Sequence, residues 1–285
     1  MTLKDRSVTH LRWQSQIPLF LTAAVGATAI VFKCFDISAT NLGEIEQAIG
    51  IGTSLAVLTW KVRAATLGAA LTGGLCATAL YLATPGWWTA LWPLLALLLL
   101  TLAATRYGRA RKQRLGLAES ARGRTAPQVA ANLGAAVLAS FPLKFAEFPC
   151  GLWVISTGAI HMAIAAALAE AAADTLSSEL GEVLGGEPRM LTHFWRVPIG
   201  TDGAISVAGT AAGCAAALIV SAVASVALGI VAGDAALVAL AAIIGLFTDS
   251  LLGAVLENRG LLNNDAVNFL STIVAAIVAV AFSTS

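Results

Sequence analysis

The chain contains 285 residues, of which 58% are hydrophobic and 12% are charged, and its net charge is +1. Because a soluble globular domain carries about 25% charged residues, this composition excludes an ordinary soluble protein, and the near-zero net charge gives no basic field for nucleic acid. The apolar residues form continuous runs of about 20 residues instead of alternating with polar ones, which predicts an all-α polytopic membrane protein and not a membrane β-barrel.

Nine membrane segments are predicted along the chain, and together they form one integral membrane domain. Most are long enough to span about 30 Å of hydrocarbon at a rise of about 1.5 Å per residue. The second is short, and the fifth carries Asn132 and ends near Pro142. The N-terminal residues lack the pattern of a removable signal peptide, so we expect the first segment to be retained. The segments are 17–33, 45–60, 65–84, 87–105, 127–143, 150–172, 205–231, 235–256 and 266–283.

Basic residues predict the orientation of these segments. With the N-terminus in the cytoplasm and the C-terminus outside, 15 of the 17 Lys and Arg residues lie on the cytoplasmic side, and Lys33 and Lys144 lie outside. This distribution follows the positive-inside rule. The loops 106–126, 173–204 and 257–265 then lie together on the cytoplasmic face, where nucleotides are found.

Carboxylates gather near the predicted cytoplasmic ends of three helices. Glu170 and Asp174 are spaced i, i+4 on the sixth segment, Asp249 and Glu257 share a face of the eighth, and Asp265 opens the ninth. Ionisable groups in membrane segments are costly unless they pair, bind an ion or line a polar cavity. Oxygen ligands from several helices are what Mg²⁺ uses, together with substrate phosphates and water. We therefore predict a Mg²⁺ site with the candidate ligands Asp174, Glu179, Asp249 and Asp265.

A glycine-rich turn, VPIGTDGAISVAGT at 197–210, leads into the seventh segment. Free backbone N–H groups and the positive end of a helix dipole bind anions, which predicts a cradle for phosphate oxygens. A helix start followed by small-residue helix packing fits the same residues, and the sequence leaves both interpretations open. The candidate residues are Gly200, Thr201, Gly203, Ser206, Gly209 and Thr210.

The basic loop at 106–124 and the segment that follows it, RTAPQVAANLG, form a third polar region. In the first half of this loop, contact with anionic lipid and control of topology account for the charge. Arg124 differs, because it immediately precedes a stretch whose proline suits the first turn of a helix. Gln128 and Asn132 share a helix face at i, i+4, and either a functional role or helix packing satisfies their amides.

Taken together, these motifs resemble the phytyl-phosphate kinase family of polytopic membrane proteins, whose plastid and cyanobacterial members act in tocopherol and chlorophyll-phytol salvage. The resemblance places a catalytic core over 61–285 and variable helices over 1–60. Leu176 replaces a Trp, and Glu257 a Gln, that are common in relatives. The stretches that carry the resemblance are RTAPQVAANLG, AEAAADTLSSELG, a Pro-Arg pair, VPIGTDGAISVAGT, TDSLLGAVLE and NNDAVN.

The resemblance implies phosphate transfer from a nucleoside triphosphate, CTP in the family's characterised members, to an isoprenoid monophosphate. A phosphate monoester has a second pKa of about 6, so the acceptor needs no dedicated base, and a metal and arginines relieve the repulsion between two anions. Asp174 and Asp249 would hold Mg²⁺ and the triphosphate, and Arg124 and Arg189 would bind the acceptor or transferred phosphate. The other positions that the resemblance implies are Gln128, Asn132, Ser178, Glu179, Pro188, the 200–210 turn, Ser250, Asp265 and Asn268.

The implied partners are an isoprenoid phosphate and the lipid bilayer, with no nucleic acid and with a homodimer as a possible assembly. The expected location is the plasma (inner) membrane or a thylakoid-like membrane. Two other functions stay open. A secondary transporter for an anion or a metal would use intramembrane carboxylates, although here they lie toward helix ends instead of the midplane. A CTP-dependent lipid nucleotidyltransferase would bind the same metal and triphosphate but would release pyrophosphate.

Overall fold

The computed structural model describes residues 11–35, 39–141 and 156–283, and within these ranges the chain is mostly helical. Helices suit the apolar runs because each helix satisfies its own backbone hydrogen bonds in lipid. The helices are α2 (Arg12–Phe35), α3 (Ala39–Lys61), α4 (Leu67–Ala83), α5 (Leu91–Arg106), α6 (Arg109–Leu115), α7 (Ala126–Ser140), α8 (Thr157–Leu184), α9 (Val207–Leu228), α10 (Ala232–Leu252) and α11 (Asn264–Ser283).

Each of the nine predicted segments falls on a helix, so the all-α membrane fold is confirmed, but the count of nine crossings is not. Among the described residues, five helices are long and apolar enough to cross a membrane, namely α2, α8, α9, α10 with its extension, and α11. Helix α5 passes only together with α6, across a bend of 63°. Helices α4 and α7 are short, with 17 and 15 residues, and polar residues interrupt the apolar sequence of α3. The predicted boundaries at 143 and 150 lie outside the described residues.

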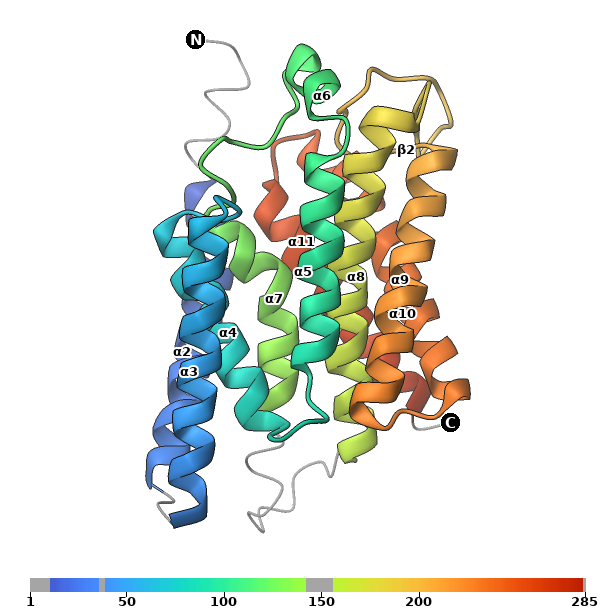
Figure 1. The fold of residues 1–285 in the computed structure, drawn as a ribbon. Helices are drawn as coiled ribbons and strands as arrows, with labels where there is room; N and C mark the ends of the chain where they lie inside the picture. The colour runs from blue at the N-terminus through green and yellow to red at the C-terminus, as the bar shows by residue number, and fades with distance from the viewer. Residues whose placement is uncertain (1–10, 36–38, 142–155, 284–285) are drawn as a thin grey trace.

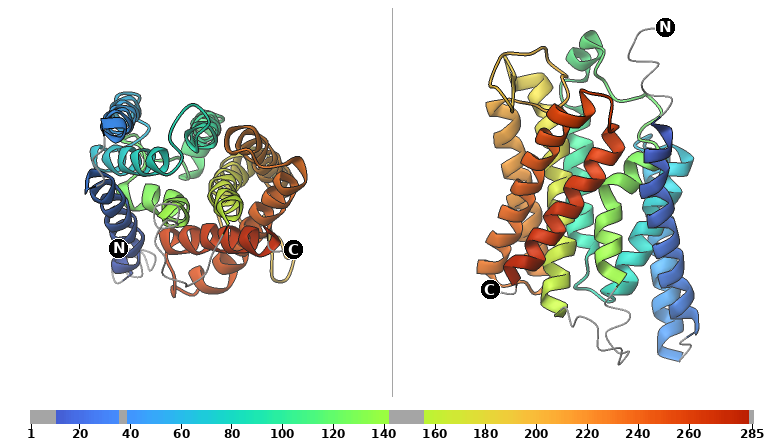
Figure 2. Two further views of the ribbon diagram at one scale, coloured as in Figure 1. Left: turned by 90° about the horizontal axis from the view of Figure 1, so that it is seen from below. Right: turned by 180° about the vertical axis from the view of Figure 1, so that it is seen from behind.

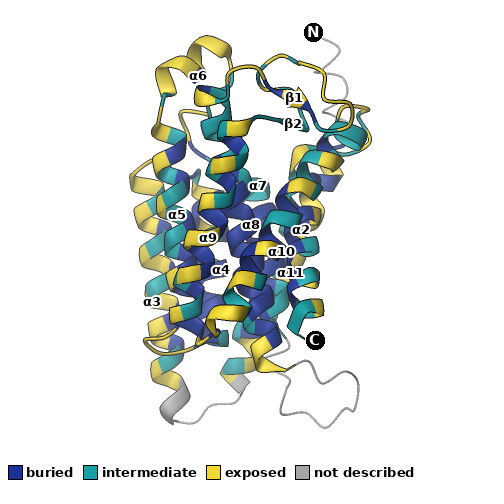
Figure 3. Ribbon diagram, turned by 90° about the vertical axis from the view of Figure 1, so that its right-hand side faces the viewer, coloured by how far each residue is buried: buried dark blue, intermediate teal, exposed yellow. Residues whose placement is uncertain are grey.

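Helix α8 is the centre of the bundle and packs against α5, α7, α9, α10 and α11. In its apolar stretch 89% of the residues are buried, against 22–39% in the other four spans, so the surrounding helices separate α8 from lipid. Most residues between Ala163 and Ala173 are alanines, and such small side chains let neighbouring helices approach closely. Figures 2 and 3 show this buried helix inside the bundle.

Successive long helices run in alternating directions, so their connections gather at the two ends of the bundle (Figure 1). One end, termed the polar end, carries the connections 62–66, 107–125, 185–206 and 258–263. The loops that were predicted to lie together do share this end. The predicted start of the loop 173–204 was wrong, because α8 continues to Leu184, so that Asp174 and Glu179 lie within the helix. The side of the membrane that the polar end faces stays a prediction.

A short antiparallel pair, β1 (Arg189–Met190) and β2 (Ala204–Ile205), folds the connection 185–206 back on itself, with Arg189 opposite Ile205. Gly203 has a φ of 75°, and a Cβ there would lie 2.1 Å from the Ala254 backbone nitrogen. Only glycine therefore lets this connection rest on the end of α10. At this contact α10 continues as one π-helical turn, η2 (Gly253–Glu257), a feature that is frequent at functional sites.

Helices α3 and α4 cross where two glycines face each other. A Cβ on Gly52 would lie 2.1 Å from Thr78 Oγ1 and 2.6 Å from the Gly74 carbonyl oxygen. A Cβ on Gly74 would lie 2.7 Å from the Gly52 carbonyl oxygen. The Thr78 hydroxyl also donates a hydrogen bond to the Ala48 carbonyl at 3.2 Å. The missing side chains thus set the distance between the two helices.

This crossing predicts a position-specific loss of stability. Gly52→Val should lower the free energy of unfolding by about 1–3 kcal/mol, because the added atoms force the two helices apart. Gly50→Val is the matched control, since a Cβ at Gly50 has no neighbour within 4 Å. Thermal unfolding of the purified variants in detergent measures the difference, and equal losses for the two variants would contradict the close crossing.

Candidate functional site at the polar end

Two predicted metal ligands come together inside the bundle. Asp174 on α8 and Asp249 on α10 are close enough to interact electrostatically, and Glu170 adds a third negative charge to their surroundings. Ser271 on α11 lies between the acids and donates a hydrogen bond to Asp249 Oδ2 at 3.3 Å. The helix continues from Asp174 to Leu184, so this acidic cluster lies about 15 Å below the helix end. The site is recessed in the bundle and not on its surface.

Glu170 belongs to this cluster, although it is absent from the predicted ligand set. Its residue is 1% exposed, and its Oε1 atom has no hydrogen-bond partner. Gly245 on α10 makes room for it, because a Cβ at that glycine would lie 2.6 Å from Glu170 Cγ. The i, i+4 spacing to Asp174 is the signal in the sequence that pointed to Glu170. A buried oxygen without a partner makes this region attractive to a cation or a proton.

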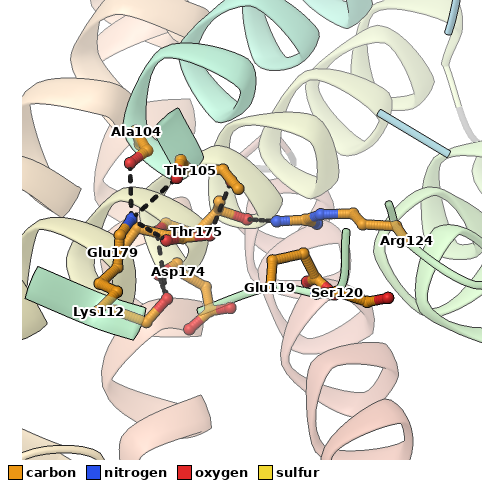
Figure 4. A network of polar contacts seen from close by, with 10 residues as sticks. Ala104, Thr105, Lys112, Glu119, Ser120, Arg124, Asp174, Thr175 and Glu179 are labelled. Carbon is orange, nitrogen blue, oxygen red and sulfur yellow. Dashed lines mark hydrogen bonds and ion pairs between the residues drawn. The ribbon is translucent and has the colours of Figure 1, made fainter. Parts of the chain in front are cut away.

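Arg124 connects the acidic cluster to the loop at the polar end. Its backbone exchanges hydrogen bonds with Ala64 and Thr66, which hold the residue at the start of α7. Its Nη2 atom donates to Thr175 Oγ1 at 3.4 Å, and its charge attracts the Asp174 carboxylate. Figure 4 shows the guanidinium extending toward the α8 residues. The predicted pairing of Arg124 with this site is therefore present in the geometry.

Glu179, a predicted metal ligand, is engaged in an ion pair. Lys112 Nζ lies 2.5 Å from Glu179 Oε2, and the Thr105 hydroxyl donates to Oε1 at 2.7 Å. Lys112 also donates to the carbonyls of Ala104 and Thr105 at the end of α5, and it is 1% exposed (Figure 4). Both carboxylate oxygens of Glu179 are thus occupied, and its role is to anchor α6 on α8 instead of offering a free ligand.

Lys112 is a residue whose role the sequence interpretation missed. It sits among basic residues that were assigned to topology and lipid contact. The chain bends at Gly108, which has a φ of 60° and packs on Val183 of α8, and this bend turns Lys112 inward. The loop that carries Arg124 is therefore fastened to α8 by a buried ion pair.

A cavity of about 380 Å³ opens beside Arg124, between α3, α4, α5 and α7. Its deep wall is apolar and consists mainly of leucines from α5. Its mouth at the polar end carries four arginines together with Glu119 and Ser120. The residues that this description rests on are Leu94, Leu97, Leu98, Leu102, Leu55 and Leu133 in the wall and Arg63, Arg106, Arg109 and Arg124 at the mouth. Such a shape suits a ligand with an apolar chain and an anionic head.

Four other predicted residues, on α7 and α11, form contacts near the polar end. The Asn268 amide donates to Asn132 Oδ1 at 3.1 Å, and Asn132 lines the cavity. Gln128 Oε1 accepts hydrogen bonds from the Thr125 nitrogen and hydroxyl, so it caps the start of α7. Asp265 lies beside Ser15 of α2, and it is not among the charges that act on Asp249. The predicted ligand set thus divides between two places.

The glycine turn shows the contacts of the packing interpretation, whereas a phosphate cradle stays a prediction. Ser206 caps α9 by accepting a hydrogen bond from the Gly209 nitrogen at 3.1 Å. A Cβ on Gly209 would lie 2.6 Å from the Ser177 carbonyl oxygen of α8, and one on Gly200 would lie 2.5 Å from Leu117. Thr210 follows in the first turn of α9, and the Thr201 hydroxyl donates to the Pro198 carbonyl at 2.7 Å.

The remaining predicted residues bond within their own elements. Arg189 Nη1 donates to the Phe194 carbonyl at 3.1 Å, which directs it toward its own connection. The Ser178 and Ser250 hydroxyls donate to carbonyls of the preceding helical turn. None of these bonds reaches a carboxylate of the acidic cluster, although the Ser178 hydroxyl donates to the backbone carbonyl of Asp174 at 3.0 Å.

The acidic cluster offers few protein ligands to a metal ion. Among the described residues, no three His, Cys, Asp or Glu side chains gather closely enough to hold a metal by themselves. Mg²⁺ needs fewer protein ligands, because it binds one or two carboxylates and completes its shell with phosphate oxygens and water. Asp174 and Asp249 offer two carboxylates from different helices, and Glu170 adds negative potential. The donor set therefore fits Mg²⁺ that arrives with a polyphosphate.

Fold and site define an α-helical membrane protein in which Arg124 links an arginine-lined cavity to an acidic cluster made of the buried Glu170 and the partly exposed Asp174 and Asp249. The chain matches the model of the family described as integral membrane protein DUF92 over residues 50–276, and it belongs to that family.

Similar proteins come from archaea, cyanobacteria and plants. An uncharacterized membrane protein of Methanocaldococcus jannaschii is 40% identical over 40% of this chain and 47% of its own length. An uncharacterized membrane protein of Synechocystis is 33% identical over 62% of this chain and 67% of its own length. The chloroplastic protein VTE6 of Arabidopsis thaliana is 30% identical over 62% of this chain and 54% of its own length. The matches to the first and third cover about half of those relatives.

The family match and these relatives confirm the family that the sequence motifs indicated. No solved structure matches the chain.

The buried ion pair predicts a large loss of stability when one partner is removed. Lys112→Ala should cost about 3–5 kcal/mol of unfolding free energy, because it leaves the Glu179 carboxylate without its cation. Replacing both partners, as in Lys112→Met with Glu179→Leu, should restore most of that loss. Chemical unfolding in detergent measures these values, with Arg114→Ala on the exposed side of α6 as the control. A Lys112→Ala variant as stable as the control would contradict the anchoring role.

Proposed function

We propose that this protein is a membrane kinase that transfers the terminal phosphate of a nucleoside triphosphate to an isoprenoid monophosphate. The observation that carries the proposal is the position of Arg124, which lines the mouth of an apolar cavity and also attracts Asp174. A lipid phosphate in the cavity and a metal-bound triphosphate at the acidic cluster would thus share one arginine. CTP is the donor and phytyl phosphate the acceptor that the family resemblance implies.

The proposed donor site consists of Asp174 and Asp249. These carboxylates would hold Mg²⁺ together with phosphate oxygens of the triphosphate, and the ion would neutralise charge on the transferred group. Ser271 would fix the position of Asp249 through its hydrogen bond, and Glu170 would add negative charge that attracts the ion. Asn132 and Asn268, which bond to each other beside the cavity, would supply amide donors to phosphate oxygens.

The proposed acceptor site consists of the cavity and the arginines at its mouth. An oxygen of the acceptor monophosphate attacks the γ-phosphorus of the triphosphate. The bond between that phosphorus and the β–γ bridging oxygen breaks, and the oxygen leaves with the electron pair on the nucleoside diphosphate. The attacking oxygen is already ionised near neutral pH, so the reaction needs no general base. Arginines lower the repulsion between the two anions as they approach.

Family membership supports this proposal, and so does the basic character of the polar end. The described Lys and Arg residues of the connections at this end include Arg63, Arg122, Arg196 and Arg259. By the positive-inside rule they favour a cytoplasmic polar end, where nucleotides are available. A plasma membrane or a thylakoid-like membrane is the proposed location.

Product analysis tests the proposed reaction. Purified protein in lipid nanodiscs is incubated with Mg²⁺, a nucleoside triphosphate labelled at the γ-phosphate, and phytyl or geranylgeranyl monophosphate. We expect the label in the lipid diphosphate and the nucleoside diphosphate as co-product. Label in pyrophosphate would instead identify a nucleotidyltransferase. Label that stays in the triphosphate with every acceptor, while a substrate moves across vesicles, would identify a transporter.

The acidic cluster predicts which substitutions abolish turnover. Asp174→Asn and Asp249→Asn should each lower kcat by at least about 100-fold, because the transferred charge loses its preorganised metal. Asp234→Asn is the matched control, since Asp234 lies in the first turn of α10 at the opposite end of the bundle. Size-exclusion profiles and thermal unfolding verify that the variants fold. Near-normal turnover in either folded variant would contradict the assignment of the donor site.

A further inference from the structure

The cavity beside Arg124 is partly open to its surroundings. Helix α5 packs on α8 and α9 and makes few contacts with α4, so a gap separates it from the α3–α4 pair. The end-on view in Figure 2 shows α5 standing apart from α3 and α4. Leu55 and Leu98 line the two sides of this gap, and α4 and α7 form its floor. This opening is termed the lateral groove.

The lateral groove opens toward the lipid-facing surface. Leu58 on α3 and Leu99 on α5, which follow its lining residues, are 52% and 65% exposed. Leu95, Leu98 and Leu102 form one half-exposed stripe on α5 at helical spacing. These exposed leucines give both edges of the groove an apolar surface, which suits contact with acyl chains.

Charge divides the groove into a head region and a tail region. The arginine mouth lies at the polar end, while the α5 wall from Thr101 down to Leu94 is almost wholly apolar. The distance along α5 from Arg106 to Leu94 is about 18 Å at 1.5 Å per residue. An anionic head would pair with the arginines while a hydrocarbon chain covers the leucines. With a volume of about 380 Å³ the cavity accommodates one chain more readily than two.

Gly73 on α4 keeps the floor of this groove open. It is partly exposed, and a Cβ there would have a single neighbouring atom within 4 Å, Val129 Cγ1 at 3.8 Å. Packing does not require a glycine at this position, in contrast to Gly74, whose missing side chain admits the Gly52 carbonyl. A glycine inside a helix costs about 1 kcal/mol relative to alanine. The absence of a side chain at Gly73 leaves space in the groove.

We propose that the lateral groove is the entrance through which a single-chain lipid monophosphate passes from the bilayer to Arg124, and that Gly73 keeps its floor free for the tail. This inference rests on the proposed function, which supplies the reaction that the lipid undergoes. It adds the route by which the lipid enters and the residue, Gly73, that keeps this route open. A long-chain acceptor needs the groove, whereas a short water-soluble monophosphate reaches the arginines from the polar end.

The test compares acceptors of two lengths in Gly73→Phe and in Leu71→Phe. Leu71 lies on the same helix and is 61% exposed, so it adds the same ring outside the groove. Gly73→Phe should raise KM for geranylgeranyl monophosphate in nanodiscs about tenfold or more, since the ring displaces several CH₂ groups from apolar contact. KM for dimethylallyl monophosphate in water should change less than about twofold. Leu71→Phe should change neither value.

Direct binding separates this inference from the proposed function. Native mass spectrometry measures retention of geranylgeranyl monophosphate by each variant, without any turnover. If the parent protein binds the lipid but forms no diphosphate, the kinase assignment is wrong, and loss of binding in Gly73→Phe still supports the groove. Equal binding in all three proteins, or an equal loss for long and short acceptors, would overturn the groove assignment. Retention of a two-chain phosphatidic acid in preference to the single-chain lipid would also overturn it.

Discussion

Close packing around the alanine-rich helix α8 is the constraint on which the rest of the structure depends. Its small side chains let five helices surround it, so any polar group that it carries is removed from lipid. The acids Glu170, Asp174 and Glu179, which it carries together with Glu182, therefore face groups on neighbouring elements. Toward the polar end, the neighbouring helices also place charged side chains beside these acids, and a reaction becomes feasible there.

Three of the four acids on α8 meet different environments. Glu179 is neutralised by Lys112, which fastens the loop over the site. Asp174 faces Arg124 and Asp249, and so stands between the guanidinium at the cavity mouth and the other acids of the cluster. Glu170 is enclosed beside Gly245 and Ser271. Helix α8 thus carries the anchoring residue Glu179, the proposed ligand Asp174 and the buried acid Glu170 at successive turns. The proposed function uses this order.

Helical periodicity and charge bias made much of this arrangement predictable. Apolar runs placed nine helices, and i, i+4 spacing put Glu170 and Asp174 on one face. Lys112 could not be found in this way, because the bend at Gly108 that turns it inward depends on contact with Val183. The cavity was equally hidden, since it arises from the gap between α4 and α5. The sequence also does not distinguish a small residue that lets a neighbouring backbone approach, such as Gly203, from a small residue that would bind a phosphate.

The central claim is that a lipid phosphate and a metal-bound triphosphate meet at Arg124. The most direct measurement is an experimental density map of the protein in nanodiscs with Mg²⁺, a non-hydrolysable nucleoside triphosphate and geranylgeranyl monophosphate. The proposed function predicts the acceptor phosphate beside Arg124, its tail between α3 and α5, and the metal between Asp174 and Asp249. Density for the lipid phosphate away from Arg124, or for the triphosphate away from both aspartates, would contradict it.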